Sequence, residues 1–343
     1  MILGIESTAH TFGIGVVDTE NQRFFVLKNS KESSGKGKIL CNIKDSYTTE
    51  KGGIIPMEAA KHHAGVAEVV YQKALKEAGI SEKEIKAIAI SNAPGLPPCL
   101  VEGMKFAKKK AFQLNVPLIS VNHCVAHLEI GKITGARDPI LLYASGANTQ
   151  IIAYAAGKYR VFGETLDIGV GNFIDNFARI AGIGFPGGPK IQKIAENGSY
   201  IELPYSIKGM DVTFSGMLTK LKQMYENNKY EVKDLAFSLQ ETAFAMLVEA
   251  AERALAHTGK KELVLGGGVA CNTRLQEMCR IMCEERGAKF FVPDNEFLVD
   301  NGAMIAYLGE IMWKAGILTD VNDIEKLDIE PRQRTDEVEV GWR

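Results

Sequence analysis

The sequence predicts an α/β protein built from two similar halves, and three observations indicate this fold class. The chain has 343 residues, which is enough for about two domains at roughly 100–200 residues each. Each half opens with three strand-like runs and continues with alternating helices and strands, in the order βββαβαβα. Glycine-rich turns recur in both halves, as expected where a backbone turns tightly or approaches a ligand.

The first half begins with short apolar runs and then alternates helices with strands. The segment 29–53 is polar and rich in Gly, Lys and Ser, which predicts a surface loop. Pro56 stands where a helix can begin, because the first helical turn does not need its missing N–H. The predicted elements in order are strands at 2–6, 12–18 and 24–28, the loop at 29–53, a helix at 56–79, a strand at 85–90, a rigid turn at 93–98, a helix at 101–112, a strand at 118–121 and a helix from about 122.

The second half repeats this order with different insertions. Its first strand is predicted at 139–144 (PILLYA), a continuous apolar run that is typical of a buried strand. The segment 231–258 predicts one long helix. The other elements in order are strands at 150–155 and 159–162, helices at 172–181 and 189–197, a strand at 263–265 that ends in three glycines, a helix at 272–285, a strand at 289–292 and a helix after 300.

Two halves of this kind face each other in the superfold shared by actin, Hsp70 and the sugar kinases. In that arrangement ATP lies in the cleft between the lobes, with its phosphates near glycine-rich strand ends. We therefore predict a two-lobed actin-like ATPase (ASKHA) fold, divided into an N-terminal lobe at 1–136, a C-terminal lobe with a helical insertion at 137–317 and a polar tail at 318–343 that wraps the surface. A single doubly wound sheet is the alternative, because it also combines strands with βα units.

Charge and composition exclude several classes of protein. The net charge is −2 and the pI is near 6.4, so binding to nucleic acid would need a local basic patch or a partner subunit. The six cysteines form no C-x-x-C pair, which favours free thiols in a reducing cytosol over a zinc ribbon or a disulfide framework. We expect no signal peptide and no transmembrane helix, because the chain has neither the charged start nor the long apolar run that these segments need.

The pair His123 and His127 is the sharpest candidate site. On a helix, residues four apart share one face, so both imidazoles can hold one cation. A zinc protease of this spacing needs a Glu directly after the first histidine as its general base, and Cys124 stands there instead. Asp300 is the candidate third ligand, and two histidines with one carboxylate suit iron(II) or zinc. An Asp at a helix start is also a common cap, so this assignment stays open.

Two further charged clusters have simpler interpretations. His62 and His63 are adjacent on a predicted helix, so their side chains diverge and we interpret them as structural residues or partner contacts. A lysine run could contact RNA phosphates, but a solvated helix face is the default interpretation. The run consists of Lys105, Lys108, Lys109 and Lys110.

Glycine-rich turns form the second candidate site. They lie at 143–149 (YASGANT) between two strands, at 184–189 (GFPGGP) before a helix and at 266–272 (GGGVACN) between a strand and a helix. Backbone N–H groups at such turns and helix starts can hold phosphates. Three of them in one half indicate a nucleotide site, although none matches the P-loop or the Rossmann pattern.

At these residues the whole chain resembles a known family, the tRNA N6-adenosine threonylcarbamoyltransferases (TsaD in bacteria, OSGEP in eukaryotes). The archaeal-eukaryotic branch, which supplies the catalytic subunit of the KEOPS complex, is the most similar. The matching stretches follow the family's order: LGIESTAHT, GGIIPMEAAKHH, APGL, VNHCVAHLEIG, LLYASGANTQ, YRVFGETLDIGVGNFIDNFAR, FPGGPKI, KGMDVTFSG, SLQETAFAML, LGGGVACNTRL and DNGAMIA. The resemblance implies the actin-like fold and the transfer of threonylcarbamoyl from threonylcarbamoyl-AMP to N6 of adenosine 37 in ANN-decoding tRNAs, with AMP as the leaving group.

The resemblance also implies site residues. One divalent metal per subunit, iron(II) first and zinc second, would be held by His123, His127, Tyr143 and Asp300. Threonylcarbamoyl-AMP, in whose place ATP can bind, would be held by Tyr143, Ala144, Ser145, Gly146, Ala147, Asp175, Gly188, Gln192 and Asn272. No separate catalytic nucleophile is implied, because the adenosine N6 can attack directly.

Partners and location are implied in the same way. The partners would be tRNA and the other KEOPS subunits, namely a kinase-like ATPase, a small dimerising subunit and a tRNA-tail-binding subunit. No membrane association is implied, and the expected location is the cytoplasm.

Two departures from the family pattern motivate an alternative function. Ala147 stands where the family usually has Gly, and Gln192 stands where it usually has Glu. If the backbone at Ala147 requires a positive φ, the Ala side chain would cost on the order of 1 kcal/mol. The alternative is a paralogue with weakened catalysis that acts as a scaffold for tRNA or KEOPS partners. A small-molecule kinase on the same superfold is disfavoured, because such kinases hold magnesium mainly through carboxylates and phosphates.

Overall fold

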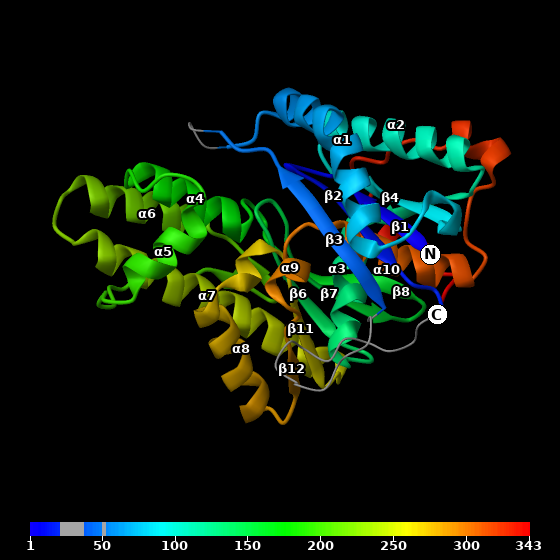
Figure 1. The fold of residues 1–343 in the computed structure, drawn as a ribbon. Helices are drawn as coiled ribbons and strands as arrows, with labels where there is room; N and C mark the ends of the chain where they lie inside the picture. The colour runs from blue at the N-terminus through cyan, green and yellow to red at the C-terminus, as the bar shows by residue number, and fades with distance from the viewer. Residues whose placement is uncertain (21–37, 50–52) are drawn as a thin grey trace.

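Two mixed five-stranded sheets form the core of the computed structural model, which describes residues 1–20, 38–49 and 53–343 (Figure 1). The first sheet has the order β3-β2-β1-β4-β5 and comprises β1 (Ile2–Glu6), β2 (Thr11–Val17), β3 (Ile39–Ser46), β4 (Ala87–Ala93) and β5 (Leu118–Asn122). The second has the order β12-β11-β6-β7-β8 and comprises β6 (Ile140–Ala144), β7 (Thr149–Ala155), β8 (Lys158–Glu164), β11 (Glu262–Gly266) and β12 (Lys289–Phe291).

The two sheets have the same topology. Read from its other edge, the second sheet is β8-β7-β6-β11-β12, which repeats the first sheet strand for strand. In both, an antiparallel meander is extended by two parallel strands on the side of its first strand. The predicted α/β class with duplicated βββαβαβα units is therefore confirmed. The single doubly wound sheet is wrong, because the two halves form separate sheets.

The third strand of the first sheet differs from the prediction. The predicted surface loop at 29–53 is wrong for β3, which pairs antiparallel with β2 over Ile39–Ser46. Ile39 and Cys41 are buried at alternate positions there, and the surrounding lysines and glycines hide this alternation in the sequence. The strand predicted at 24–28 lies outside the described residues, as do 29–37 and 50–52 of the predicted loop.

Helices cover both faces of the first sheet. On one face lie α1 (Pro56–Ala78), which begins at the proline identified from the sequence, and α2 (Pro97–Leu114). On the other face lies α10 (Gly302–Lys314), which comes from the far end of the chain. Glycines allow its close approach, because a Cβ at Gly4 would lie 2.1 Å from the backbone nitrogen of Ala306. The apolar runs interrupted by glycine in β1 and β2 thus mark a helix-packing surface.

The second sheet carries the larger helical layer. Its helices are α4 (Val170–Ile180), α5 (Gly187–Ala195), α6 (Ser215–Glu226), α7 (Val232–Thr258) and α8 (Thr273–Glu285). The long helix α7 packs against the sheet and against α5 and α8. The helix α6 and the short hairpin of β9 (Ile207–Lys208) and β10 (Asp211–Val212) were not expected from the sequence. Figure 1 shows α4, α5 and α6 extending away from the two sheets.

One helix joins the halves, and α10 packs against it. The short helix α3 (His123–Ile130) follows β5 of the first sheet, and it contacts α10 as well as β6 and β11 of the second sheet. One apolar cluster accordingly contains Ile2 and Ala89 of the first sheet together with Leu141 and Val264 of the second. The lobe boundaries at 136/137 and 317/318 stay predictions.

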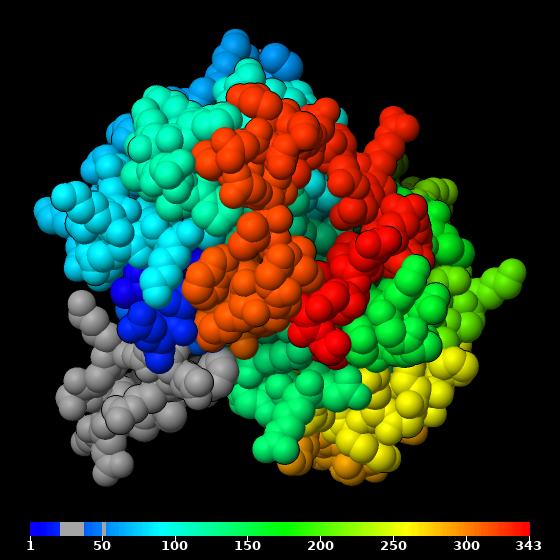
Figure 2. Space-filling view, turned by 90° about the vertical axis from the view of Figure 1, so that its right-hand side faces the viewer, coloured from blue at the N-terminus to red at the C-terminus, as the bar shows by residue number. Residues whose placement is uncertain are grey.

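The C-terminal tail lies across both halves, and Figure 2 shows it in red on the surface. Thr319 exchanges backbone hydrogen bonds of 2.8 and 3.0 Å with Leu118 of the first sheet. Further along, the Trp342 ring lies 6.2 Å from the ring of Tyr159 in the second sheet. The six cysteines are free thiols. Among residues 1–20, 38–49 and 53–343, no helix combines the length and apolar character needed to cross a membrane.

Candidate metal and nucleotide site

The two predicted histidines lie on α3, which starts directly after β5. Asn122 caps this helix, because its side-chain oxygen accepts hydrogen bonds from the backbone N–H groups of Cys124 and Val125 at 3.0 and 3.2 Å. The one-turn spacing places the rings of His123 and His127 4.7 Å apart, centroid to centroid. Both side chains are buried.

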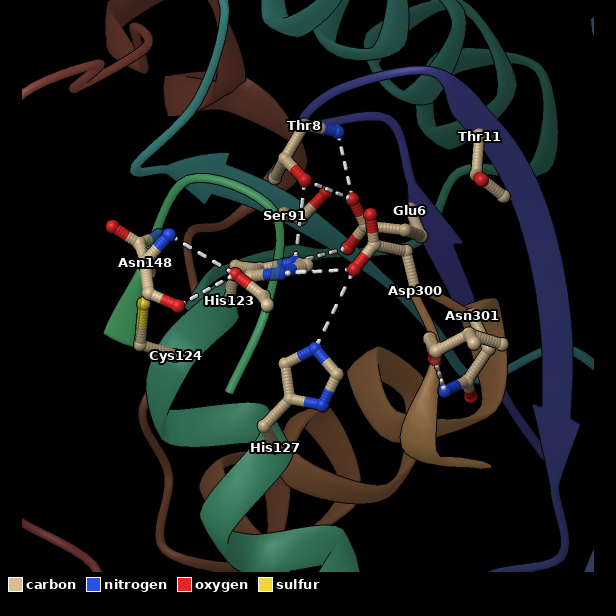
Figure 3. A network of polar contacts seen from close by, with 12 residues as sticks. Glu6, Thr8, Thr11, Ser91, His123, Cys124, His127, Asn148, Asp300 and Asn301 are labelled. Atoms are coloured by element: carbon tan, nitrogen blue, oxygen red, sulfur yellow. Dashed lines mark hydrogen bonds and ion pairs between the residues drawn. The ribbon is translucent and has the colours of Figure 1, made fainter. Parts of the chain in front are cut away.

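Tyr143 and Asp300 complete the cluster from other elements. Tyr143 lies on β6, and its hydroxyl is 3.0 Å from Nε2 of His123. Asp300 lies just before α10, and its Oδ1 is 3.3 Å from Nε2 of His123 and 3.6 Å from Nε2 of His127. Figure 3 shows both rings turned toward Asp300. Because its side-chain oxygens face the histidines, Asp300 is not acting as a helix cap; Asn301 caps α10 instead.

Burial and charge shift the ionisation of the cluster in different directions. Burial alone lowers the pKa of His123, but the neighbouring carboxylates of Glu6 and Asp300 outweigh it and hold the pKa well above its ordinary value. Burial raises the pKa of Asp300, but His123 outweighs it and holds the pKa well below its ordinary value. At His127 burial dominates and lowers the pKa. The protein's own charges alone therefore favour an ion pair between His123 and Asp300 beside a neutral His127, and a bound cation would replace the proton on Nε2 of His123.

The cluster fits a divalent metal. One ligand atom each from His123, His127 and Asp300 lies within 4.8 Å of the others. Neither ring nitrogen of His127 has a hydrogen-bond partner among the described residues, and an unsatisfied buried polar group costs roughly 1–3 kcal/mol. A cation at Nε2 of His127 would remove that cost for this nitrogen. Two imidazoles, one carboxylate and a phenol oxygen form a donor set that suits iron(II) or zinc.

Sequence reasoning missed Glu6 and Thr8, which contact Nδ1 of His123, and Ser91, which accepts a hydrogen bond from the backbone N–H of Ser7. Glu6 is fully buried at the end of β1, and its Oε2 accepts a hydrogen bond from Nδ1 of His123 at 2.9 Å (Figure 3). The sequence did contain an indication of this contact. Glu6 is the last residue of an otherwise apolar strand, and a carboxylate that is buried there requires a partner.

The first glycine-rich turn continues directly from Tyr143. In this turn Ala144 is buried, whereas Gly146 and Ala147 are exposed. The turn rests on the start of α4, where the backbone N–H of Gly171 donates to the Ser145 carbonyl at 3.0 Å. The third turn touches it, because a Cβ at Gly267 would lie 2.3 Å from the Ala144 oxygen. Two of the three predicted phosphate-binding turns are thus neighbours.

The other predicted nucleotide residues lie on the helices beside these turns. Asp175 of α4 accepts a hydrogen bond from the backbone N–H of Gly187 at 2.7 Å, and burial raises its pKa. The next residue, Gly188, has open space where a side chain would be. Gln192 donates to the Thr273 hydroxyl at 2.9 Å, beside Asn272, which caps α8. The roles of these residues in binding a nucleotide stay predictions.

The backbone at Ala147 does not adopt the conformation that would strain an alanine. Among the described residues, positive φ angles at non-glycine positions occur at Asn115, Ala156 and Asn228, and not at Ala147. The Ala side chain therefore costs no backbone strain there. Of the two departures from the family pattern, only Gln192 still supports the alternative of a scaffold with weakened catalysis.

The histidine pair outside the site is structural. His62 contacts Asp45 at 2.9 Å, and His63 is buried against the ring of Phe12. Among the lysines, the predicted solvated face is wrong at Lys110, because this residue is buried and lies 4.0 Å from the centre of the Tyr71 ring.

Comparisons with known proteins agree with the resemblance seen in the sequence. A family model described as tRNA N6-adenosine threonylcarbamoyltransferase matches residues 38–307. A protein of that name from Thermococcus kodakarensis is 52% identical over 341 residues, which cover 99% of each chain. A probable bifunctional tRNA threonylcarbamoyladenosine biosynthesis protein from Methanosarcina mazei is 50% identical; the match covers 99% of this chain and 59% of that longer protein.

Solved structures share the fold at low identity. HypF of T. kodakarensis superposes with a TM-score of 0.57 at 14% identity, covering 95% of this chain and 49% of HypF. The activator of 2-hydroxyisocaproyl-CoA dehydratase from Clostridium difficile, solved with bound ADPNP, gives 0.54 at 11% identity, covering 95% and 96% of the two chains. At such identities the similarity is one of fold alone.

Proposed function

The chain belongs to the tRNA N6-adenosine threonylcarbamoyltransferase family and is a transferase, and from this premise we propose that it forms threonylcarbamoyladenosine at position 37 of ANN-decoding tRNAs in a metal-dependent reaction. The observation that carries the proposal is the position of Tyr143. Its hydroxyl reaches His123 at 3.0 Å, and its backbone continues into the turn Ala144–Ala147. The candidate metal donors and the candidate phosphate-binding turn are therefore joined at the end of one strand.

In the proposed reaction, N6 of adenosine attacks the carbamoyl carbon of threonylcarbamoyl-AMP. The new C–N bond replaces the bond to the phosphate oxygen, N6 releases one proton to solvent, and AMP leaves. The backbone N–H groups of Gly146 and Ala147 would be offered to the phosphate, whereas those of Ser145 and Gly267 already donate to the carbonyls of Asn148 and Leu298. A divalent iron or zinc ion held by His123, His127, Tyr143 and Asp300 would supply Lewis-acid polarisation of the substrate oxygens.

The protein's own residues would provide orientation. Asp175 lies on α4 beside Gly188, where open space leaves room for a ligand. Gln192 lies on α5 and would offer its side-chain oxygen to ribose or base, since its NH₂ donates to Thr273. Asn272 lies beside it at the start of α8, where its side chain caps the helix and donates to Gln240. Holding the acyl donor and N6 at reacting distance is itself a large part of catalysis, because it makes the attack effectively intramolecular.

We further propose that the chain acts as the catalytic subunit of KEOPS in the cytoplasm, where tRNA is available. The bifunctional relative carries additional sequence beyond the stretch that matches this chain, which supports a functional partner. The near-neutral net charge of −2 also supports a contribution of partner subunits to tRNA affinity, since phosphate contacts need basic groups.

A reconstituted transfer assay tests the proposal. The chain and its KEOPS partners are combined with the enzyme that forms threonylcarbamoyl-AMP, threonine, bicarbonate, ATP and an ANN-decoding tRNA, and the digested nucleosides are analysed by mass spectrometry. We expect threonylcarbamoyladenosine from the wild type and from His62→Ala, which removes a histidine outside the site, and none from His123→Ala.

Absence of product from folded, metal-loaded wild-type protein would contradict the transferase proposal and favour the scaffold. In that case Gln192→Glu should restore product if the missing carboxylate is the cause, and Ala147→Gly should not, because Ala147 adopts a negative φ.

A further inference from the structure

Glu6 is a buried carboxylate that the proposed ligand set does not use. It closes strand β1, whose other residues are apolar, and its side chain has no exposure to solvent. A carboxylate in such a position is stable only when its oxygens accept hydrogen bonds. Oε1 accepts from the backbone N–H of Thr8 at 2.7 Å and from the Thr8 hydroxyl. Oε2 accepts from Nδ1 of His123 at 2.9 Å.

This contact fixes the side of the imidazole that faces the candidate metal position. A histidine whose Nδ1–H is held by a carboxylate keeps its proton on Nδ1 and presents the lone pair of Nε2. Nε2 of His123 points the other way, toward the Tyr143 hydroxyl at 3.0 Å and Asp300 Oδ1 at 3.3 Å. Glu6 and the donor set thus lie on opposite edges of one ring.

The turn that carries Glu6 is itself held in place by its surroundings. The backbone N–H of Ser7 donates to the Ser91 hydroxyl at 3.0 Å, and that of Leu96 donates to the Thr8 carbonyl at 2.8 Å. A Cβ at Gly95 would lie 2.6 Å from the same carbonyl oxygen. The carboxylate therefore has little freedom to follow a displaced ring, which makes it a fixed reference for His123.

We propose that Glu6 is a positioning residue that holds Nδ1–H of His123 and so directs Nε2 to the metal. The inference rests on the metal centre of the proposed function and assigns a residue that the donor set does not include. His127 provides the contrast, because neither of its ring nitrogens has a hydrogen-bond partner among the described residues. Of the two histidines, His123 is therefore the one whose ring edge remote from the donor set is held by a carboxylate.

The substitution Glu6→Gln separates this role from simple space filling. Glu6 offers two acceptor oxygens, one toward Thr8 and one toward His123, whereas a glutamine of nearly the same shape offers only one. If the amide oxygen faces the Thr8 donors, its NH₂ faces Nδ1 and favours the tautomer with the proton on Nε2. If the oxygen faces His123, the NH₂ meets the N–H of Thr8. The first arrangement opposes metal binding at Nε2, and the second keeps the contact to Nδ1 only by placing two N–H donors against each other. Metal binding at Nε2 therefore requires the less stable arrangement, and the metal affinity falls.

Zinc affinity of the purified chain measures the effect without relying on activity. We expect wild-type protein to bind one equivalent of Zn²⁺ in a chelator competition titration. Loss of an outer partner of a ligating histidine weakens metal binding by about 10–100-fold, so we expect a reduction of that size for Glu6→Gln and Glu6→Ala. The matched control is Glu310→Gln, which removes a fully buried carboxylate that pairs with Lys38 and Lys314. It should bind zinc within about twofold of wild type.

The outcomes separate this inference from the proposed function. If the wild type binds zinc and folded Glu6→Gln binds it equally well, the positioning role is wrong and the metal centre stands. If the wild type binds no zinc, both are wrong. A proton on Nδ1 of His123 in ¹⁵N-histidine spectra of zinc-loaded wild type is the expected signature, and its absence would also contradict the positioning role.

Discussion

Replacing Gly267 tests how tightly the two candidate phosphate turns are joined. Gly267 has φ 90° and ψ 159°, a region that essentially only glycine adopts. Forcing another residue there costs roughly 1–3 kcal/mol. A Cβ would also lie 2.3 Å from the Ala144 oxygen and 2.6 Å from its carbonyl carbon, and such overpacking costs roughly 1–3 kcal/mol more. We expect Gly267→Ala to lower the free energy of unfolding by about 2–6 kcal/mol.

Gly268→Ala is the matched control, because a Cβ there would meet nothing closer than Val299 Cγ1 at 3.9 Å. Both variants are unfolded in urea and followed by circular dichroism, and ATP binding is measured by calorimetry. The displaced Ala144 should also weaken nucleotide binding in Gly267→Ala. Surface substitutions usually change the free energy of unfolding by no more than about 0.5 kcal/mol. If the free energies of unfolding of the two variants differ by no more than this, Gly267 does not contact Ala144 closely and the prediction is wrong.

Three further predictions concern the metal, acid stability and the tail. His127→Ala removes one proposed metal donor, so the metal content of the purified protein should fall below about a tenth of wild type by mass spectrometry; an unchanged content would exclude His127 as a ligand. Burial lowers the pKa of His63 to about 4, so the folded state keeps this ring neutral. The unfolded chain binds a proton at this histidine below pH 6.5, whereas the folded chain does not until the pH is near 4. The free energy of unfolding therefore falls by about 3 kcal/mol between these two pH values. His63→Leu should therefore reduce the difference between the free energies of unfolding in urea at about pH 7 and about pH 4.5; an unchanged difference would mean that His63 does not cause it. Arg343→Ala removes a hydrogen bond of 2.9 Å to the buried carboxylate of Glu129 and should lower the free energy of unfolding by about 1–2 kcal/mol; an unchanged value would mean that the end of the tail does not stabilise the fold.

Local pattern was enough to predict most secondary structure and the histidine pair. A repeat of 3.6 residues per turn brings His123 and His127 to one helix face whatever the rest of the chain does. The same applies to Pro56 at the start of α1 and to the apolar run of β6. The strand β3 was not predicted, because its alternation of buried residues is short and lies within a polar segment. Pairing with β2 makes this segment a strand.

The tertiary structure alone decided which distant residues meet. Tyr143 and Asp300 entered the sequence analysis by family resemblance or by residue type, since nothing in the spacing joins them to His123. They meet because α3, which follows the first sheet, packs against α10 and against β6 and β11 of the second sheet. The contact between Glu6 and His123 and the negative φ at Ala147 likewise cannot be predicted from one sequence, because both depend on the backbone geometry of the folded chain. Helical periodicity involves residues a few positions apart, so it can be detected in the sequence. This site instead depends on contacts between residues far apart in the chain, and these are known only from the folded structure.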